Sequence, residues 1–240
     1  MAESRMRRIK VWDLAIRLFH WAIVLLMALL WYTGQVGGLD VDVTLPGGFD
    51  LFLPNTDLHM LLGQAVLVLL VFRVLWGVFG SGTARFTNFV RGPRAVFGYL
   101  GQLLRGRLPV STGHNPAGGV MVLVLLGLLA AQTITGLFAN DDIFSQGPLA
   151  HLVSGDTSAA LTSLHRKLFD YLLIAAGFHI LAVLYYMIRG ENLITPMFSG
   201  RKPEALIDPA ERGEVKMAPL WLAVLLFVLS LAAVWGLGKL

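Results

Sequence analysis

Residues 161–190, LTSLHRKLFDYLLIAAGFHILAVLYYMIRG, decide the fold, because this apolar run carries two histidines, His165 and His179. They are fourteen residues apart, and at about 100° per residue this spacing places both imidazoles on one helix face, about 21 Å apart along the axis. A histidine inside a membrane helix is costly unless it faces the interior of a helix bundle and has a partner there. We therefore expect each histidine to be paired with a residue of similar depth on another helix.

The composition indicates a polytopic membrane protein. Hydrophobic residues make up 56% of the 240 residues and charged residues only 14%, which is more apolar than a soluble domain. The chain has no cysteine, and this excludes disulfides, thiolate metal sites and covalent attachment of a c-type haem. The net charge of +4 belongs to loops beside membrane spans, so we expect no nucleic-acid partner.

Five apolar runs are long enough to cross a bilayer, which requires about 20 residues each. They are approximately residues 14–36, 58–80, 117–138, 161–188 and 218–237. The first follows a basic segment, as a signal peptide does, but its apolar run is too long and no cleavage site follows. The sequence therefore predicts an all-α membrane protein with a four-helix, ligand-holding bundle in residues 1–200. A linker and a fifth transmembrane helix follow in residues 201–240.

Lysine and arginine lie on one side of the predicted membrane domain. With five spans, three basic groups share that side: Arg5, Arg7, Arg8, Lys10 and Arg17; Arg85, Arg91, Arg94, Arg105 and Arg107; Arg189, Arg201, Lys202, Arg212 and Lys216. The opposite loops, 37–57 and 139–160, have neither residue type and carry seven aspartates: Asp40, Asp42, Asp50, Asp57, Asp141, Asp142 and Asp156. The positive-inside rule then predicts a cytoplasmic N-terminus and a C-terminus outside.

Four histidines fall within the apolar runs at two depths. His20 lies near the cytoplasmic end of the first span and matches the depth of His179, while His59, at the outer end of the second span, matches His165. Two bis-imidazole sites in a four-helix bundle, without cysteines or carboxylate clusters, suit two b-type haems better than a hydrolytic metal. An interhelical hydrogen bond would explain any one of these histidines, but the two matched depths favour ligation.

Two residues repeat the fourteen-residue spacing on the histidine faces. Gly34 follows His20 at the outer level, where a missing side chain would let a porphyrin edge approach the backbone. Arg73 follows His59 at the inner level, where its guanidinium would pair with haem propionates or, equally well, extend to nearby lipid headgroups.

Other polar and aromatic residues also have simple explanations. Arg166 and Lys167, next to His165, would bind propionates of the outer haem or, slightly better, anchor the helix at the membrane interface. We expect His114 and His151 to be solvated loop residues. We expect an aromatic belt at the membrane interface, formed by Trp12, Trp31, Tyr32 and Trp76. We expect hydrogen bonds between helices from Gln132, Thr133 and Thr135.

Several segments together resemble one known family. They are VWDLAIRLFHW (11–21), DLHMLLGQAVLVLLVFRVLWG (57–77), HNPAGG (114–119), QTITGLFANDD (132–142), LHRKLFDYLL (164–173) and FHILAVLYY (178–186). To about residue 201 the chain resembles the bacterial cytochrome b561 and nickel–iron hydrogenase b-type cytochrome group. The resemblance implies a dihaem cytochrome of the bacterial inner membrane that passes electrons between the quinone pool and a redox partner. In that membrane the outer side, where the charge pattern places the C-terminus, is the periplasm. The resemblance also implies the haem ligands His20, His59, His165 and His179, and it assigns no residue to the quinone.

The expected chemistry is electron transfer, because an iron with two imidazole ligands has no vacant position for a substrate. The redox partner stays open among a periplasmic c-type cytochrome, a hydrogenase and superoxide. The aspartates predict that a water-soluble partner docks outside through a basic patch, although exclusion of positive charge from translocated loops explains them equally well. The rival class is a histidine-lined transporter of a divalent metal, which would show helices broken near the midplane, whereas these spans lack a central proline.

Overall fold

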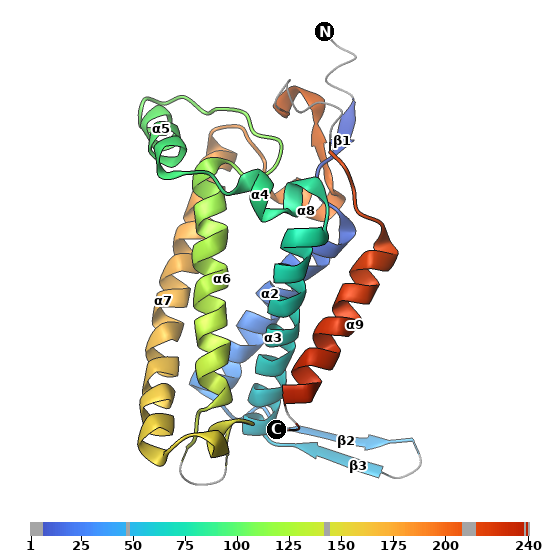
Figure 1. Ribbon diagram of the computed structural model, residues 1–240, viewed down its shortest axis with the longest axis vertical. Coiled ribbons are helices and arrows are strands. Elements are labelled where there is room, and N and C mark those ends of the chain that lie inside the picture. Colours follow the sequence, from blue (N-terminus) through green and yellow to red (C-terminus); the bar gives the residue numbers. More distant parts are fainter. Residues whose placement is uncertain (1–6, 47–48, 142–144, 208–214, 238, 240) are drawn as a thin grey trace. The chain divides into compact units, whose positions relative to one another are not determined.

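The computed structural model describes residues 7–46, 49–141, 145–207, 215–237 and 239. Arg5, Asp142 and Arg212, which contributed to the charge pattern above, lie outside these ranges. Within the described ranges, five helices are long and apolar enough to cross a membrane (Figure 1). They are α2 (Leu14–Trp31) with its π-helical end η1 (Tyr32–Val36), α3 (Asn55–Phe79), α6 (Pro116–Leu137), α7 (Gly155–Ile188) and α9 (Leu220–Leu237). The predicted all-α polytopic membrane architecture is therefore confirmed.

Shorter elements precede and connect these helices. On the side predicted to be cytoplasmic they are β1 (Arg8–Lys10), η2 (Gly82–Ala84), α4 (Phe86–Phe89), α5 (Pro93–Leu104), α8 (Ile194–Ser199), β4 (Arg201–Pro203) and η4 (Glu204–Leu206). On the opposite side they are β2 (Val41–Leu45), β3 (Phe49–Leu53) and η3 (Ala150–Leu152). β1 pairs antiparallel with β4, and β2 pairs antiparallel with β3.

Two of the long helices begin earlier than the apolar pattern predicts. α3 starts at residue 55 rather than 58, and α7 starts at residue 155 rather than 161. The additional turns are polar, so hydropathy does not detect them. In α7 they bind the end of α6, because Ser158 Oγ donates a hydrogen bond of 2.7 Å to the Phe138 carbonyl.

The chain forms two compact units, whose boundaries fall inside all five long helices. Unit 1 comprises Met1–Phe19, Phe72–Gly127 and Leu172–Leu226. Unit 2 comprises His20–Val71, Leu128–Tyr171 and Phe227–Leu240. Each unit has its own buried apolar cluster.

The core of unit 1 forms around Trp76 and Asp13. Its buried apolar members are Ile16, Phe72, Trp76, Ala84, Ala223 and Leu226. Asp13 caps α2, because its Oδ1 accepts the Ile16 N–H at 2.7 Å, and its Oδ2 accepts the indole N–H of Trp76 at 3.1 Å. Trp76 is only 1% exposed, so its predicted place in an interfacial belt is wrong. A buried indole needs an acceptor for its N–H, and Asp13 supplies one.

Buried polar pairs fasten the connections of unit 1. Lys202 Nζ donates to the Glu191 carboxylate at 2.6 Å and to the Ser111 carbonyl at 2.8 Å. The hydroxyls of Tyr99 and Tyr186 are 2.6 Å apart. Burial, and then this hydrogen bond, raises the pKa of Tyr99, so the phenol stays protonated at ordinary pH. These bonds hold α5 and β4 against the end of α7.

Unit 2 contains the β2–β3 hairpin, which lies crosswise to α3 and α9 beyond the ends of these helices (Figure 1). Its helical part is packed around Leu67, Val68 and Val234. Four elements of unit 2 supply the side chains of the site described next: the π turn η1, the first turns of α3, and the facing segments of α6 and α7.

Candidate functional site

His59 of α3 and His165 of α7 come together in unit 2. Their ring centroids are 6.4 Å apart, and the ring planes are nearly perpendicular, at 82°. A metal–imidazole bond is about 2.0 Å long and the ring centre lies about 1 Å beyond the nitrogen, so two imidazoles on opposite sides of one metal have centres about 6 Å apart. The structure therefore brings this predicted pair to the separation that a shared metal requires.

A threonine hydroxyl determines the tautomer of His59. Thr33, in the π turn η1, has its Oγ1 2.8 Å from His59 Nδ1. The same hydroxyl donates its hydrogen to the Leu29 carbonyl at 2.9 Å, so its oxygen accepts from the imidazole. His59 therefore carries its proton on Nδ1, and the lone pair of Nε2 is available to a metal.

His165 has the same tautomer for a related reason. Its Nδ1 lies 2.8 Å from the backbone carbonyl oxygen of Gln132, and a carbonyl only accepts, so Nδ1 carries the proton. The Gln132 side-chain amide nitrogen lies 3.2 Å from His165 Nε2 and donates to it. Thr135 Oγ1 adds a longer contact of 3.4 Å to Nδ1. Both imidazoles thus have the lone pair on Nε2, which in His165 accepts the Gln132 amide N–H, and partners of their Nδ1 atoms hold both rings in orientation.

Glycines lie against both rings. A Cβ on Gly34 would come within 3.1 Å of His59 Cε1, and a Cβ on Gly136 within 2.9 Å of His165 Cε1. The sequence predicted that Gly34 lies at the depth of the outer site, and in the structure Gly34 packs directly against His59. Gly136 was not predicted, and the only shared sequence feature is weak: each glycine directly follows a threonine, and in the structure Thr33 contacts His59 and Thr135 contacts His165.

The outer site fits a haem held by two imidazoles. We define this site as His59 and His165 together with Thr33, Gly34, Gln132, Thr135 and Gly136. These residues offer two imidazoles whose ring centroids are 6.4 Å apart, beside two glycines that lack side chains. Across the described ranges, no cluster of three or more His, Cys, Asp or Glu side chains could hold a metal ion. Two imidazoles alone do not complete the coordination of a bare ion, whereas a porphyrin supplies four further nitrogens.

The inner histidines are divided between the units. His20 is the first residue of unit 2, where its ring packs edge-on against Trp21 with centroids 4.9 Å apart. His179 belongs to unit 1. Both are half-buried, and their pairing stays a prediction.

Arg73 is buried inside unit 1, with only 2% of its surface exposed. Its guanidinium lies over the ring of Phe86, 4.8 Å from the centroid, and 5.9 Å from that of Phe89. Gly77 leaves room for the Phe86 ring, because a Cβ on residue 77 would lie 2.0 Å from that ring. Within the described part of the chain, Arg73 Nη1 has no hydrogen-bond partner. The side chain therefore does not extend to headgroups, and its free donor suits an anionic group.

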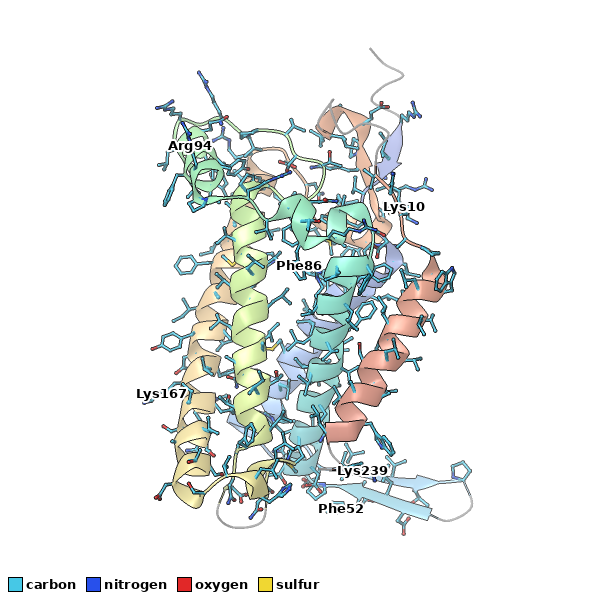
Figure 2. The ribbon with its side chains drawn as sticks, viewed as in Figure 1. Lys10, Phe52, Phe86, Arg94, Lys167 and Lys239 are labelled. Atoms are coloured by element: carbon cyan, nitrogen blue, oxygen red, sulfur yellow. The ribbon has the colours of Figure 1, made fainter. Side chains whose placement is uncertain are left out.

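Other predicted residues lie at the surface or in loops. Arg166 and Lys167 are exposed, and Lys167 points away from α6 (Figure 2). His151 is exposed as expected. The prediction of a solvated His114 is wrong, because this ring is half-buried against Trp12 and Phe89, with centroids 4.9 and 4.6 Å away. The faces of an imidazole pack readily on aromatic rings, and chain neighbours give no sign of such distant partners.

Comparison with known proteins identifies a family. A family model described as Prokaryotic cytochrome b561 matches residues 11–200. The matched range includes all four span histidines and ends before α9 (Leu220–Leu237). No curated protein and no solved structure matches the chain.

Proposed function

The chain belongs to the prokaryotic cytochrome b561 family and is a membrane b-type cytochrome of electron transfer, and on this premise we propose that it binds two b-type haems. It passes electrons across the bacterial inner membrane between the quinone pool and a redox partner on the outer side. The observation that carries this proposal is the His59–His165 pair, with its 6.4 Å separation and a hydrogen-bond partner at each Nδ1 atom.

The four histidines are the proposed axial ligands, His59 with His165 outside and His20 with His179 inside. A haem iron with two imidazole ligands supplies reversible one-electron chemistry without a vacant coordination position. Acceptors at Nδ1 orient each outer ring and increase the basicity of Nε2. Thr33 and the Gln132 carbonyl serve in this role.

Charged residues and glycines complete the proposed cofactor sites. Arg73 is assigned to the propionates of the inner haem, supported by its burial and its unsatisfied Nη1. Arg166 and Lys167 follow His165 directly and provide exposed positive charge for the outer propionates. Gly34 is assigned to the outer site, supported by its place against His59.

The proposed orientation has the N-terminus in the cytoplasm and the C-terminus in the periplasm. The basic segments that support it belong to unit 1, with β1, α5 and β4, while the described aspartates of the outer loops belong to unit 2. Large apolar side chains are exposed along the spans, among them Leu25, Val74, Ile134, Phe178 and Leu225. Lipid is the natural neighbour of such a surface.

The test of this proposal is haem content by pyridine haemochrome and reduced-minus-oxidised absorbance spectra. The purified protein should contain two b-type haems per chain. His59→Ala and His165→Ala should each lose one haem with the same spectrum, and His20→Ala and His179→Ala should each lose the other. His151→Ala, at an exposed loop histidine, is the matched control and should retain both.

Two outcomes would contradict the assignment. If His20→Ala and His59→Ala lose the same haem, the pairing by depth is wrong. If His165→Ala keeps both haems, the outer imidazole pair is not a ligand pair, whatever the separation of its rings.

A further inference from the structure

The β2–β3 hairpin of unit 2 has two chemically different faces. Side chains alternate between the faces of a strand, and directly opposite residues share a face. The register pairs Val41 with Leu53 and Val43 with Leu51 on one face, and Asp42 with Phe52 and Thr44 with Asp50 on the other. Val43 and Leu51 are 45% and 47% exposed. One face therefore presents only aliphatic side chains among these pairs, and the other carries the carboxylates together with Phe52, which is 60% exposed.

The hairpin is fastened where two spans end. Asp40 Oδ1 accepts the backbone N–H of Asn55 at 2.8 Å, and Asn55 Oδ1 accepts the backbone N–H of Leu39 at 3.2 Å. The Asn55 side-chain nitrogen also donates to the Thr33 carbonyl at 2.9 Å. These bonds tie the base of the hairpin to the end of η1 and the start of α3. The strands accordingly leave at the level where both helices reach the membrane surface, and run crosswise to the helix axes (Figure 1).

We propose that this hairpin is a membrane-interface element, with the Val41, Val43, Leu51 and Leu53 face resting on lipid and the Asp42, Thr44 and Asp50 face turned to water. A two-stranded hairpin is at best marginally stable in water alone, so its apolar face needs a cover. The hairpin begins where two spans end and runs parallel to the bilayer surface, so lipid is the apolar material next to this face. This placement does not depend on haem binding or on electron transfer.

Two further observations favour lipid as the occupant. The first span ends just before the hairpin, and its last turns present Trp31, Tyr32 and Val36, which are 46%, 40% and 60% exposed. Tryptophan and tyrosine mark the membrane–water boundary. The charges of the hairpin are all negative and lie on the opposite face, where anionic headgroups do not repel them at close range.

The absence of cysteine permits a direct test with single spin labels on the full chain. Val43→Cys and Leu51→Cys report on the apolar face, and Asp42→Cys and Thr44→Cys on the polar face. Each variant is labelled with a nitroxide and reconstituted into vesicles of phosphatidylcholine and phosphatidylglycerol. Relaxation of the label is then measured with oxygen, which concentrates in lipid, and with a water-soluble nickel chelate. Helical circular dichroism, unchanged from the parent, identifies variants that keep the fold.

The expected result is an oxygen-to-nickel accessibility ratio that alternates with a period of two residues, high at 43 and 51 and low at 42 and 44. High nickel accessibility at all four positions would place the hairpin in water and overturn the proposal. Protection of positions 43 and 51 from both reagents would overturn it in favour of a protein occupant, a second copy of the chain or a partner. Lipid accessibility at 42 and 44 alone would show that the faces are reversed.

Discussion

At the scale of single residues, the Thr33 hydroxyl accepts from His59 Nδ1 and thereby affects the redox group that His59 is proposed to ligate. Thr33→Val removes the acceptor and keeps the branched shape. The imidazole then becomes a weaker donor, and oxidised iron is less stabilised. We expect the midpoint potential of the outer haem to rise by tens of millivolts in a potentiometric titration, as the loss of one hydrogen bond of about 1 kcal/mol implies.

Thr133 provides the matched control, because its hydroxyl donates to the Leu129 carbonyl of its own helix at 2.9 Å. Thr133→Val should leave the midpoint potentials of both haems unchanged. Thr33→Ser, which keeps the hydroxyl, should have the same outer-haem potential as the parent protein. An equal shift in Thr133→Val, or none in Thr33→Val, would show that the Thr33 contact does not tune the site.

At the scale of the elements, α6 is predicted to require glycine where it faces His165. Gly136→Ala introduces a Cβ 2.9 Å from His165 Cε1, a distance at which the imidazole must move. We expect the outer haem to be partly or wholly lost while the inner haem stays, as measured by haem content and by redox titration. The cost of forcing a methyl group into a packed site is about 1–3 kcal/mol.

Gly127 lies in the same helix and tests whether alanine is harmful to α6 in general. A Cβ there would meet no other atom within 4 Å, and alanine is the better helix former. Gly127→Ala should therefore keep both haems and raise the thermal stability slightly. Equal loss of haem in both variants would assign the effect to the helix rather than to the His165 contact.

The long helices and the His59–His165 pair were predictable because the bilayer imposes a length, a composition and a depth on each span. The local geometry around the pair was not. The two Thr–Gly dipeptides, 33–34 and 135–136, are too short and too common to indicate that each packs on a histidine. Trp76 and His114 were misplaced for a similar reason, since their covering partners, Asp13 and Phe89, are distant in the chain.

At the scale of the whole molecule, the acidic outer loops bear on the choice of redox partner. Several aspartates already have structural tasks: Asp40 caps the start of α3, Asp50 accepts the Thr44 hydroxyl, and Asp141 accepts the Ser145 N–H. Asp42 is exposed on the polar face of the hairpin. Within the described ranges the Asp42 carboxylate therefore has no such structural task and is available to attract a basic partner protein.

We expect reduction or oxidation of a basic, water-soluble partner to slow as ionic strength rises, because salt screens the attraction that speeds encounter. Stopped-flow rates across a salt series measure this, and Asp42→Asn should lower the rate at low salt only. Arg94→Gln, in the basic α5 segment, is the control and should have no effect. A rate indifferent to salt, or one that depends on Arg94 instead, would contradict docking through the acidic loops.

The π turn η1, closed by the Gly37 N–H bonding to the Tyr32 carbonyl at 3.0 Å, makes the end of the first span sensitive to insertions and deletions. A π turn holds one residue more than an α-helical turn. Deleting one residue from 32–36 would convert the π turn into an α-helical turn, so the flanking residues would keep their register, but Thr33 and Gly34, which lie inside the turn, would move relative to His59. In a relative whose first span is one residue shorter, the equivalent threonine and glycine should therefore be sought at shifted positions, where a column-by-column alignment would miss them.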